Sequence, residues 1–311
     1  MSRIHEALKK AEQERATIQA GDVQSGWTPA SPVEPAAFSE PAAQTAQESN
    51  AVATAAIADI APAFSVEALL ARCPQLTWKP DLGVSLFMNG NESAKGTEEF
   101  RTLRSRLYLM REKMPLKKLL ITSALPKEGK SFTASNLAQV FVRQHGRRVL
   151  LIDADLRGPR LHLMLGTSSE PGLSDYLLGN SDEFSIIQRG GLESLFFVPS
   201  GTGIENPAEL VGNGRLKVLL QGVEPLFDWI IIDSPPSIPV SDAAVLAKAC
   251  DGVLMVVRSE LTPSNIARKA RMEFREESLL GVVLNGINEK AAAYARYYYD
   301  EYAKSGTRNK S

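Results

Sequence analysis

The sequence predicts an α/β fold in which helices cover both faces of one parallel β-sheet. Two observations predict it. Short, unbroken apolar runs recur beyond residue 97, as expected of strands that are buried on both faces. Segments with helical patterns alternate with these runs, which is the order of elements in a parallel sheet wrapped by helices.

The elements follow one another regularly from residue 97 onward. The expected strands are residues 119–122, 149–152, 195–198, 229–232, 252–257 and 280–284. The expected helices are residues 98–110, 132–144, 210–220 and 263–274. Gly212 and Gly214 weaken the third of these helices near its start.

The chain before residue 97 is less regular. Residues 1–17 predict a short amphipathic helix, either a frayed surface helix or a docking helix for a partner. Residues 18–64 are dominated by Ala, Pro, Ser, Thr, Glu and Gln, and predict a disordered linker. Residues 65–95 are ambiguous: Val66, Leu69 and Leu70 suggest one or two helical turns, and Trp78 suggests an extended stretch packed on the domain.

Composition narrows the class of protein. The 311 residues, 44% of them apolar, suffice for one ordinary domain with appendages. A net charge of −1 gives no general attraction to nucleic acid or anionic lipid. The two cysteines, Cys73 and Cys250, show no metal-binding spacing and fit a reducing compartment. Without a signal peptide or a long apolar run, the chain is expected in the cytoplasm, reaching the inner face of the plasma membrane only through a partner.

Residues 124–131 have the register of a phosphate-binding P-loop, with alanine in place of the usual first glycine. They follow a predicted strand and open a predicted helix, which is the context that this motif requires. Backbone N–H groups at such a helix N-terminus point at phosphates. Lys130 adds a cation, and the Ser131 hydroxyl can bind Mg²⁺. The candidate nucleotide-binding residues here are Ala124, Pro126, Lys127, Glu128, Gly129, Lys130, Ser131 and Phe132.

Aspartates follow two further predicted strands. Asp153 and Asp155 come after the run at 149–152, and Asp233 comes after the run at 229–232. The carboxyl ends of parallel strands are where ligands bind, so these carboxylates can face Mg²⁺ and an attacking hydroxyl. Each one alone could be a helix cap or a turn residue. The three elements in order, each at a strand end, predict one site.

Five of the seven tyrosines lie within nine residues near the C-terminus: Tyr294, Tyr297, Tyr298, Tyr299 and Tyr302. Together with a phosphate-donor site, they suggest a kinase that phosphorylates its own tail, residues 287–311. A C-terminal helix that packs Tyr294, Tyr298 and Tyr302 as a stripe is the alternative, and the two are compatible before phosphorylation.

These motifs together resemble the bacterial tyrosine kinases of the polysaccharide-export type, the cytoplasmic kind that works with a separate membrane adaptor. The similarity rests on residues 124–131, 153–157, 232–236, the tyrosine cluster and Glu98-Glu-Phe-Arg101-Thr-Leu-Arg104, and spans about residues 95–302. The opening residues 1–11 are also similar to such kinases. The resemblance implies a kinase domain over residues 65–286, a P-loop NTPase of the deviant-Walker type, related to the cell-division and partitioning ATPases.

The resemblance also implies roles. Lys130 would bind the β- and γ-phosphates of ATP, and Ser131 would bind Mg²⁺. Asp153 would be the catalytic base, Asp155 and Asp233 would position Mg²⁺ through water, and Asn285 would contact the adenine or else be a turn residue. The family usually has glycine or a small residue where Lys127 stands.

Assembly is implied in the same way. Glu98, Arg101 and Arg104 line one helical face, which is either a solvated face or, as in the family, the contact that joins subunits into a ring. The implied partners are copies of the chain and a membrane-anchored polysaccharide co-polymerase adaptor, with no nucleic acid. Phosphorylation would regulate the chain length or export of an exopolysaccharide or capsule.

Two other functions fit the nucleotide site. A switch ATPase of the cell-division and partitioning type would hydrolyse ATP without kinase activity, but that class has a signature lysine where this chain has Leu125. The second alternative function is a nucleotide-binding scaffold with little catalytic activity.

Overall fold

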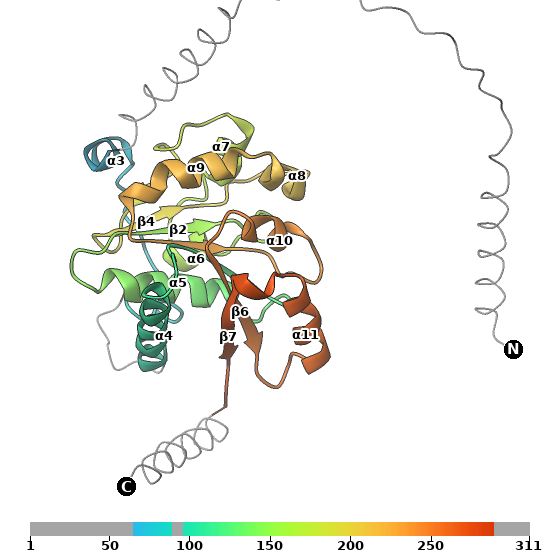
Figure 1. Cartoon of the computed structure of the whole chain (residues 1–311). Coiled ribbons are helices and arrows are strands. Elements are labelled where there is room, and N and C mark those ends of the chain that lie inside the picture. Colours follow the sequence, from blue (N-terminus) through green and yellow to red (C-terminus); the bar gives the residue numbers. More distant parts are fainter. Residues whose placement is uncertain (1–64, 89–95, 289–311) are drawn as a thin grey trace, which may run out of the picture. The chain divides into compact units, whose positions relative to one another are not determined.

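The computed structural model describes residues 65–88 and 96–288 (Figure 1). The predicted helix at 1–17, the linker at 18–64 and the tyrosines at 294–302 lie outside the described residues. Within the described ranges, no helix is long and apolar enough to cross a membrane.

A seven-stranded sheet forms the centre, in the order β3-β4-β2-β5-β1-β6-β7. Six strands run parallel, and the short β3 pairs antiparallel with β4. The strands are β1 (Lys118–Ser123), β2 (Val149–Asp153), β3 (Gln188–Arg189), β4 (Leu195–Val198), β5 (Trp229–Asp233), β6 (Gly252–Arg258) and β7 (Leu279–Asn285). The predicted α/β class is confirmed, and so are all six expected strands. The two-residue β3 was not predicted, because so short a strand leaves no pattern.

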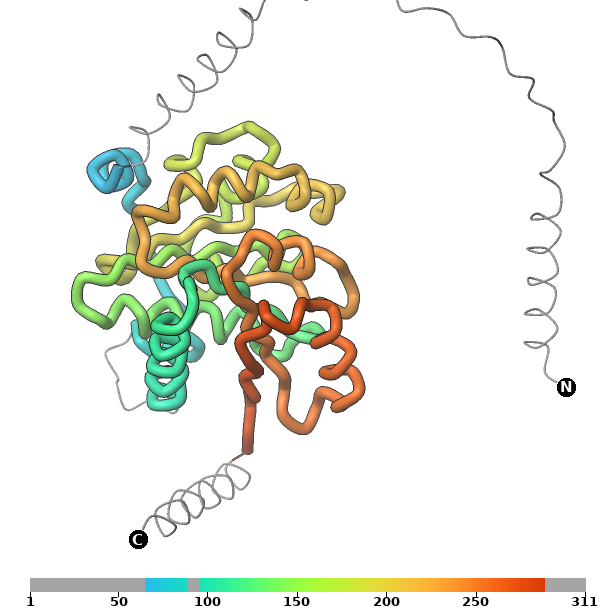
Figure 2. The backbone as a smooth tube through the Cα atoms, in the orientation of Figure 1, coloured from blue at the N-terminus to red at the C-terminus, as the bar shows by residue number. Residues whose placement is uncertain are grey.

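Helices cover both faces of the sheet, as the tube in Figure 2 shows. On one face lie α4 (Thr97–Arg111), α5 (Lys130–Val142) and α6 (Leu161–Leu165). On the other lie α3 (Val66–Arg72), α7 (Leu173–Leu178), α8 (Pro207–Gly212), α9 (Arg215–Val223) and α10 (Asp242–Ala247). The helix α11 (Ser264–Met272) packs into a third, smaller hydrophobic cluster. The 3₁₀ turns are η1 (Glu224–Leu226) and η2 (Glu276–Ser278).

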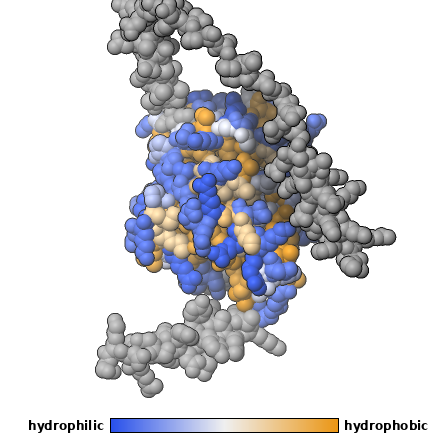
Figure 3. Space-filling view, turned by 45° about the vertical axis from the view of Figure 1, so that its right-hand side comes forward, coloured by the Kyte–Doolittle hydropathy of each residue, from blue (hydrophilic) through white to orange (hydrophobic). Residues whose placement is uncertain are grey.

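The side chains of the central strands contribute to two hydrophobic cores, one on each face of the sheet. Successive side chains of a strand point to opposite faces, so Leu150 and Ile152 join one core while Val149 and Leu151 join the other. All four are completely buried. This explains why the runs show no polar alternation. The exterior differs: hydrophilic residues cover most of the face in Figure 3, with apolar residues in separate areas.

The prediction of one continuous helix at residues 210–220 was wrong. Residues 210–220 form parts of two helices, because α8 ends at Gly212 and α9 begins at Arg215. Between them Gly214 has a φ of +86°, a left-handed conformation that ends a helix and that glycine adopts without strain.

Residues 73–88 form a strap across the β3 edge of the sheet. Leu76 N–H donates to the Arg189 carbonyl (2.8 Å) and Lys79 N–H to the Gly166 carbonyl (3.0 Å). The Trp78 ring packs edge-on against Phe197, with centroids 6.1 Å apart. The sequence expectation for residues 65–95 is confirmed where they are described, since α3 is a short helix and Trp78 is buried.

The strap then reaches α5, the helix that follows the P-loop. Leu86 N–H donates to Oδ1 of Asn136 (2.8 Å), and Phe87 N–H donates to Oε1 of Gln139 (3.2 Å). Both amide side chains belong to α5 and are fully buried. The strap therefore supplies hydrogen bonds to polar groups that would be costly to bury alone.

Trp78→Ala is expected to lower the free energy of unfolding by about 3–5 kcal/mol, because it removes a buried aromatic ring and leaves a cavity. Urea denaturation measures this change. Leu82→Ala, at a strap position that is 55% exposed, is the matched control and should change stability by less than about 1 kcal/mol. Equal effects of the two substitutions would show that the strap is not part of the folded core.

Candidate nucleotide-binding site

The loop between β1 and α5 presents unused backbone donors. The N–H groups of residues 127–132 donate no hydrogen bond to any described residue. The first N–H groups of a helix have no acceptor within the helix and attract anions. Here the loop residues before α5 add to them, so several donors are available to a phosphate chain. The predicted P-loop therefore has the donors that it needs.

Two loop residues have positive φ, Lys127 at +66° and Gly129 at +97°. A left-handed residue costs little for glycine and more for residues with a Cβ, which gives a physical reason for the small residue that the family usually has in place of Lys127. The Lys127 side chain is exposed. Phe132, at the start of α5, packs edge-on against Phe100, with centroids 5.8 Å apart.

Lys130 joins the predicted elements into one buried cluster. Its Nζ lies 2.6 Å from Oδ2 of Asp155, 3.3 Å from Oγ of Ser131 and 4.0 Å from Oδ2 of Asp233. Asp155 follows β2, and Asp233 is the last residue of β5. The structure thus brings together the lysine, serine and two aspartates that the sequence predicted from three separate segments.

Neither carboxylate oxygen of Asp233 accepts a hydrogen bond within 3.5 Å from a described residue, although Asp233 is completely buried and Oδ2 lies 4.0 Å from the Lys130 ammonium. Burial raises the pKa of this carboxyl to about 6, against the opposing effect of the Lys130 ammonium. An orphaned buried carboxylate fits a cation or its bound water. The described residues contain no cluster of three or more metal-ligating side chains. Magnesium needs no such cluster, because it commonly binds one or two carboxylates, water and substrate phosphates.

Asp153 lies beside Asp233 in the sheet and is completely buried. Its two oxygens accept hydrogen bonds from the N–H groups of Asp155 (3.3 Å) and Leu161 (3.1 Å). Burial, and then the neighbouring Asp233 carboxylate, raise the pKa of Asp153 to about 8. Asp153 therefore shapes the loop after β2, and its role as catalytic base stays a prediction.

A further ion pair connects the loops after β2 and β5. Nε and Nη2 of Arg157 donate to the two carboxylate oxygens of Asp242, at 2.8 and 3.1 Å. Asp242 begins α10 and is buried. The sequence analysis missed Asp242, since nothing local marks a partner 85 positions from Arg157.

Asn285 and Glu128 meet at the loop. Nδ2 of Asn285 donates to the Glu128 carbonyl (2.9 Å), so the end of β7 lies against the P-loop. Contact between Asn285 and adenine stays a prediction. Ala124 is buried at the start of the loop, whereas Pro126 is exposed.

Comparison with known proteins agrees with this geometry. A family model described as an AAA domain matches residues 127–265. The chain is 37% identical over 205 residues to the tyrosine-protein kinase YwqD of Bacillus subtilis, covering 65% of this chain and 85% of that protein. It is 38% identical over 208 residues to the tyrosine-protein kinase CpsD of Streptococcus agalactiae, covering 66% and 90%.

The chain belongs to the family of bacterial tyrosine-protein kinases. Solved structures support this. The kinase domain of the Escherichia coli tyrosine kinase ETK superposes with a TM-score of 0.61 at 33% identity, covering 65% of this chain and 80% of that one. The chimerical protein CapA2B2 superposes with a TM-score of 0.63 at 29% identity, covering 72% and 98%.

The predicted subunit-contact residues of this kinase lie on α4. Arg101 pairs with Glu98, on the part of the helix that faces solvent. Nη1 of Arg104 instead donates to the Val140 carbonyl of α5 (3.0 Å). Arg104 thus also fastens α4 to the P-loop helix, and the ring contact stays a prediction.

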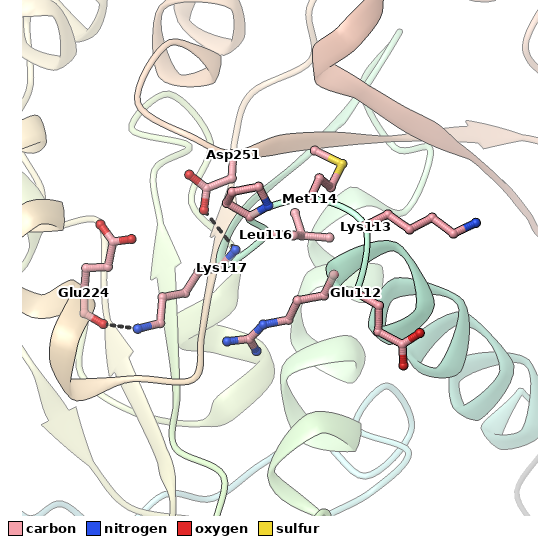
Figure 4. Close-up of a pocket in the computed structure, with 9 residues that line it drawn as sticks. Glu112, Lys113, Met114, Leu116, Lys117, Glu224 and Asp251 are labelled. Carbon is pink, nitrogen blue, oxygen red and sulfur yellow. Dashed lines mark hydrogen bonds between the residues drawn. The ribbon is translucent and has the colours of Figure 1, made fainter.

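A groove of about 550 Å³ lies at the amino ends of β1 and β6, whereas the nucleotide site lies at the carboxyl ends of the strands (Figure 4). No residue of the predicted site lines it. Three of its polar residues bind one another: Lys117 N–H donates to Asp251 (2.9 Å), and Lys117 Nζ donates to the Glu224 carbonyl. This groove is therefore separate from the nucleotide site.

The raised pKa of Asp153 predicts a pH dependence of stability. Between the ordinary aspartate pKa of about 4 and about 8, the folded state holds a proton that the unfolded chain has released, so raising the pH in this window destabilises the kinase. Asp153→Asn removes this contribution.

The measurement is the melting temperature in EDTA at several pH values from 5 to 9. The melting temperature of the wild type should fall more steeply with pH than that of Asp153→Asn, and the difference between them removes the contribution of groups that do not interact with Asp153. Asp81→Asn, at an exposed carboxylate, is the control. Parallel curves for wild type and Asp153→Asn would contradict the raised pKa.

Proposed function

We propose that this tyrosine kinase transfers the γ-phosphoryl group of magnesium-bound ATP to its own C-terminal tyrosines, on a neighbouring copy of the chain. The acceptors are Tyr294, Tyr297, Tyr298, Tyr299 and Tyr302. One observation carries the proposal. A loop with unused N–H groups lies beside a buried lysine and a buried carboxylate that accepts no hydrogen bond from a described residue.

The residues of the cluster divide the work of binding. The free N–H groups of residues 127–132 and the Lys130 ammonium hold the β- and γ-phosphates. Lys130 exchanges its carboxylate partner Asp155 for the phosphates, which frees Asp155 to face the metal. Magnesium held by Ser131 and, through water, by Asp155 and Asp233 would neutralise charge on the phosphate oxygens. Asn285 contributes beside the loop, where adenine is expected.

Transfer to tyrosine requires positioning more than covalent chemistry. Asp153 would accept the phenol proton once a cation in the site lowers its pKa, since a nearby positive charge favours the carboxylate form. Phosphorylation on a neighbouring copy agrees with the family resemblance. The assembly is a ring, with Glu98, Arg101 and Arg104 at its contacts.

We infer the biological setting from the resemblance to the family. The kinase acts in the cytoplasm, at a membrane-anchored polysaccharide co-polymerase adaptor, and regulates the chain length or export of an exopolysaccharide or capsule. Each phosphate adds a charge of about −1.5 to −2 at neutral pH. Several on one tail repel each other and the neighbouring subunit, which opens the ring.

Lys130→Met is expected to lower tyrosine labelling by at least about 100-fold, because it removes a cation that stabilises the transferring phosphoryl group. The purified protein is incubated with Mg²⁺ and ATP, with and without a basic adaptor peptide, and phosphotyrosine is mapped by mass spectrometry. Lys217→Met, at an exposed lysine of α9, is the control. ATP hydrolysis without label would favour the switch ATPase, and nucleotide binding without either would favour the scaffold.

Transfer between copies has its own test. Lys130→Met protein, with its tyrosines intact, is mixed with active protein in which the five tail tyrosines are phenylalanine. Label on the Lys130→Met copy is expected, because its tail enters the active site of the other copy. If neither copy is labelled while wild type labels itself, transfer occurs within one chain.

Phosphorylated protein should have a lower oligomer mass than unphosphorylated protein in light scattering, because the added charges repel. The phenylalanine variant, treated with ATP in the same way, controls for nucleotide effects. Equal masses for both forms of the wild type would refute the ring-opening model.

A further inference from the structure

Glu128 occupies an unusual place for a carboxylate. It lies inside the phosphate-binding loop and is only 2% exposed. Its Oε2 accepts the Leu125 N–H (2.7 Å), and its Oε1 accepts the hydroxyl of Thr262. A negative group in an anion-binding loop would repel phosphate unless it were held facing away. The hydrogen bonds to Leu125 and Thr262 hold it in one orientation.

Thr262 is fixed in turn by its own loop. It lies between the end of β6 and the start of α11, and its Oγ1 accepts the N–H of Arg258 (3.3 Å). The Arg258 N–H also approaches Glu128 Oε1 (3.5 Å). The P-loop is therefore bonded to the carboxyl end of β6, a strand that carries none of the predicted phosphate or metal ligands.

Asn285 fixes the next peptide of the P-loop from β7. Its Nδ2 donates to the carbonyl of Glu128 (2.9 Å), and its own carbonyl accepts the Ser259 N–H (2.8 Å). In a trans peptide the C=O and the following N–H point in opposite directions. A carbonyl of Glu128 held toward Asn285 therefore directs the Gly129 N–H away from Asn285.

Glycine is the residue that this arrangement accepts at 129. Its φ is +97°, and a Cβ there would lie 2.0 Å from Nδ2 of Asn285. The close approach of the amide to the loop backbone thus needs both the left-handed conformation and the missing side chain.

We infer that Glu128, Thr262 and Asn285 form a brace of positioning residues that turns the Gly129 N–H toward the phosphates of the nucleotide. The inference rests on the proposed function, because it assigns a role in the same nucleotide site. It gives Asn285 a role that needs no contact with the base. It adds Thr262, which sequence analysis did not identify.

The test compares two ligands, one of which has no base. Dissociation constants are measured by calorimetry for MgADP and for magnesium tripolyphosphate. Asn285→Leu keeps nearly the same size and adds no charge, but it removes the donor to the Glu128 carbonyl. The brace predicts about tenfold weaker binding of both ligands, which corresponds to about 1.4 kcal/mol. A contact with adenine alone predicts weaker binding of MgADP only.

Substitutions of Thr262 provide a second test, in which a conservative variant should restore binding. Thr262→Val has the same shape without the hydroxyl and should weaken both ligands severalfold, whereas Thr262→Ser keeps the hydroxyl and should bind as the wild type does. Asn265→Leu, the same change at an exposed residue of α11, is the matched control. Because the interaction serves bound substrate and transition state alike, KM should rise while kcat at saturation changes less than about twofold.

Several results would overturn the inference. These are unchanged affinity of Asn285→Leu and Thr262→Val for tripolyphosphate, a loss confined to MgADP, or a Thr262→Ser variant as weak as Thr262→Val. A lowered melting temperature with unchanged affinities would assign the brace to stability alone. If the wild type binds neither ligand, the proposed function fails and this inference fails with it. If the wild type binds both and the variants do too, only the brace fails.

Discussion

The site depends on one ammonium group placed among three carboxyl groups away from water. Lys130 contacts Asp155 directly, while Asp233 and Asp153 lie side by side at the ends of neighbouring strands. Burying charges is costly unless they are paired, and a single ammonium cannot neutralise three carboxylates. Burial raises the pKa values of Asp153 and Asp233, which favours their protonated forms. In the proposed function, bound Mg²⁺ would compensate the same carboxylate charges, since a nearby positive charge favours the ionised form.

The order of the strands creates this cluster. β2, β5 and β1 are neighbours in the sheet, so a loop at 124–131 and aspartates at 153 and 233 meet at one edge. Sequence could predict this much because each part is local: an apolar run marks the strand, and the polar residue after it marks the edge. The six expected strands are confirmed for the same reason. The parallel arrangement does the rest, since it brings all the carboxyl ends to one side.

Hydrogen bonds between residues far apart in the sequence could not be predicted in this way, because no local pattern marks them. Thr262 meets Glu128 across 134 positions, and Asp242 meets Arg157 across 85. A threonine between Leu261 and Pro263 has the pattern of an ordinary helix start, and its partner is set by how β6 packs against β1. The strap is similar. Its extended stretch at Trp78 was predicted, but its target, the buried amides of Asn136 and Gln139, follows only from the folded arrangement.

Several long-range contacts converge on the helix α5 and the loop before it. The strap binds its middle, Arg104 binds the Val140 carbonyl near its end, and the brace holds the loop at its start. All its residues from Lys130 to Phe141 except Phe132 are buried. A helix held in this way cannot shift without breaking several buried hydrogen bonds, so the fold itself fixes the loop at its start. Under the proposed function, such preorganised donors would bind phosphate without a cost for ordering the loop. The main adjustment on binding would then fall to the Lys130 side chain, which must leave Asp155.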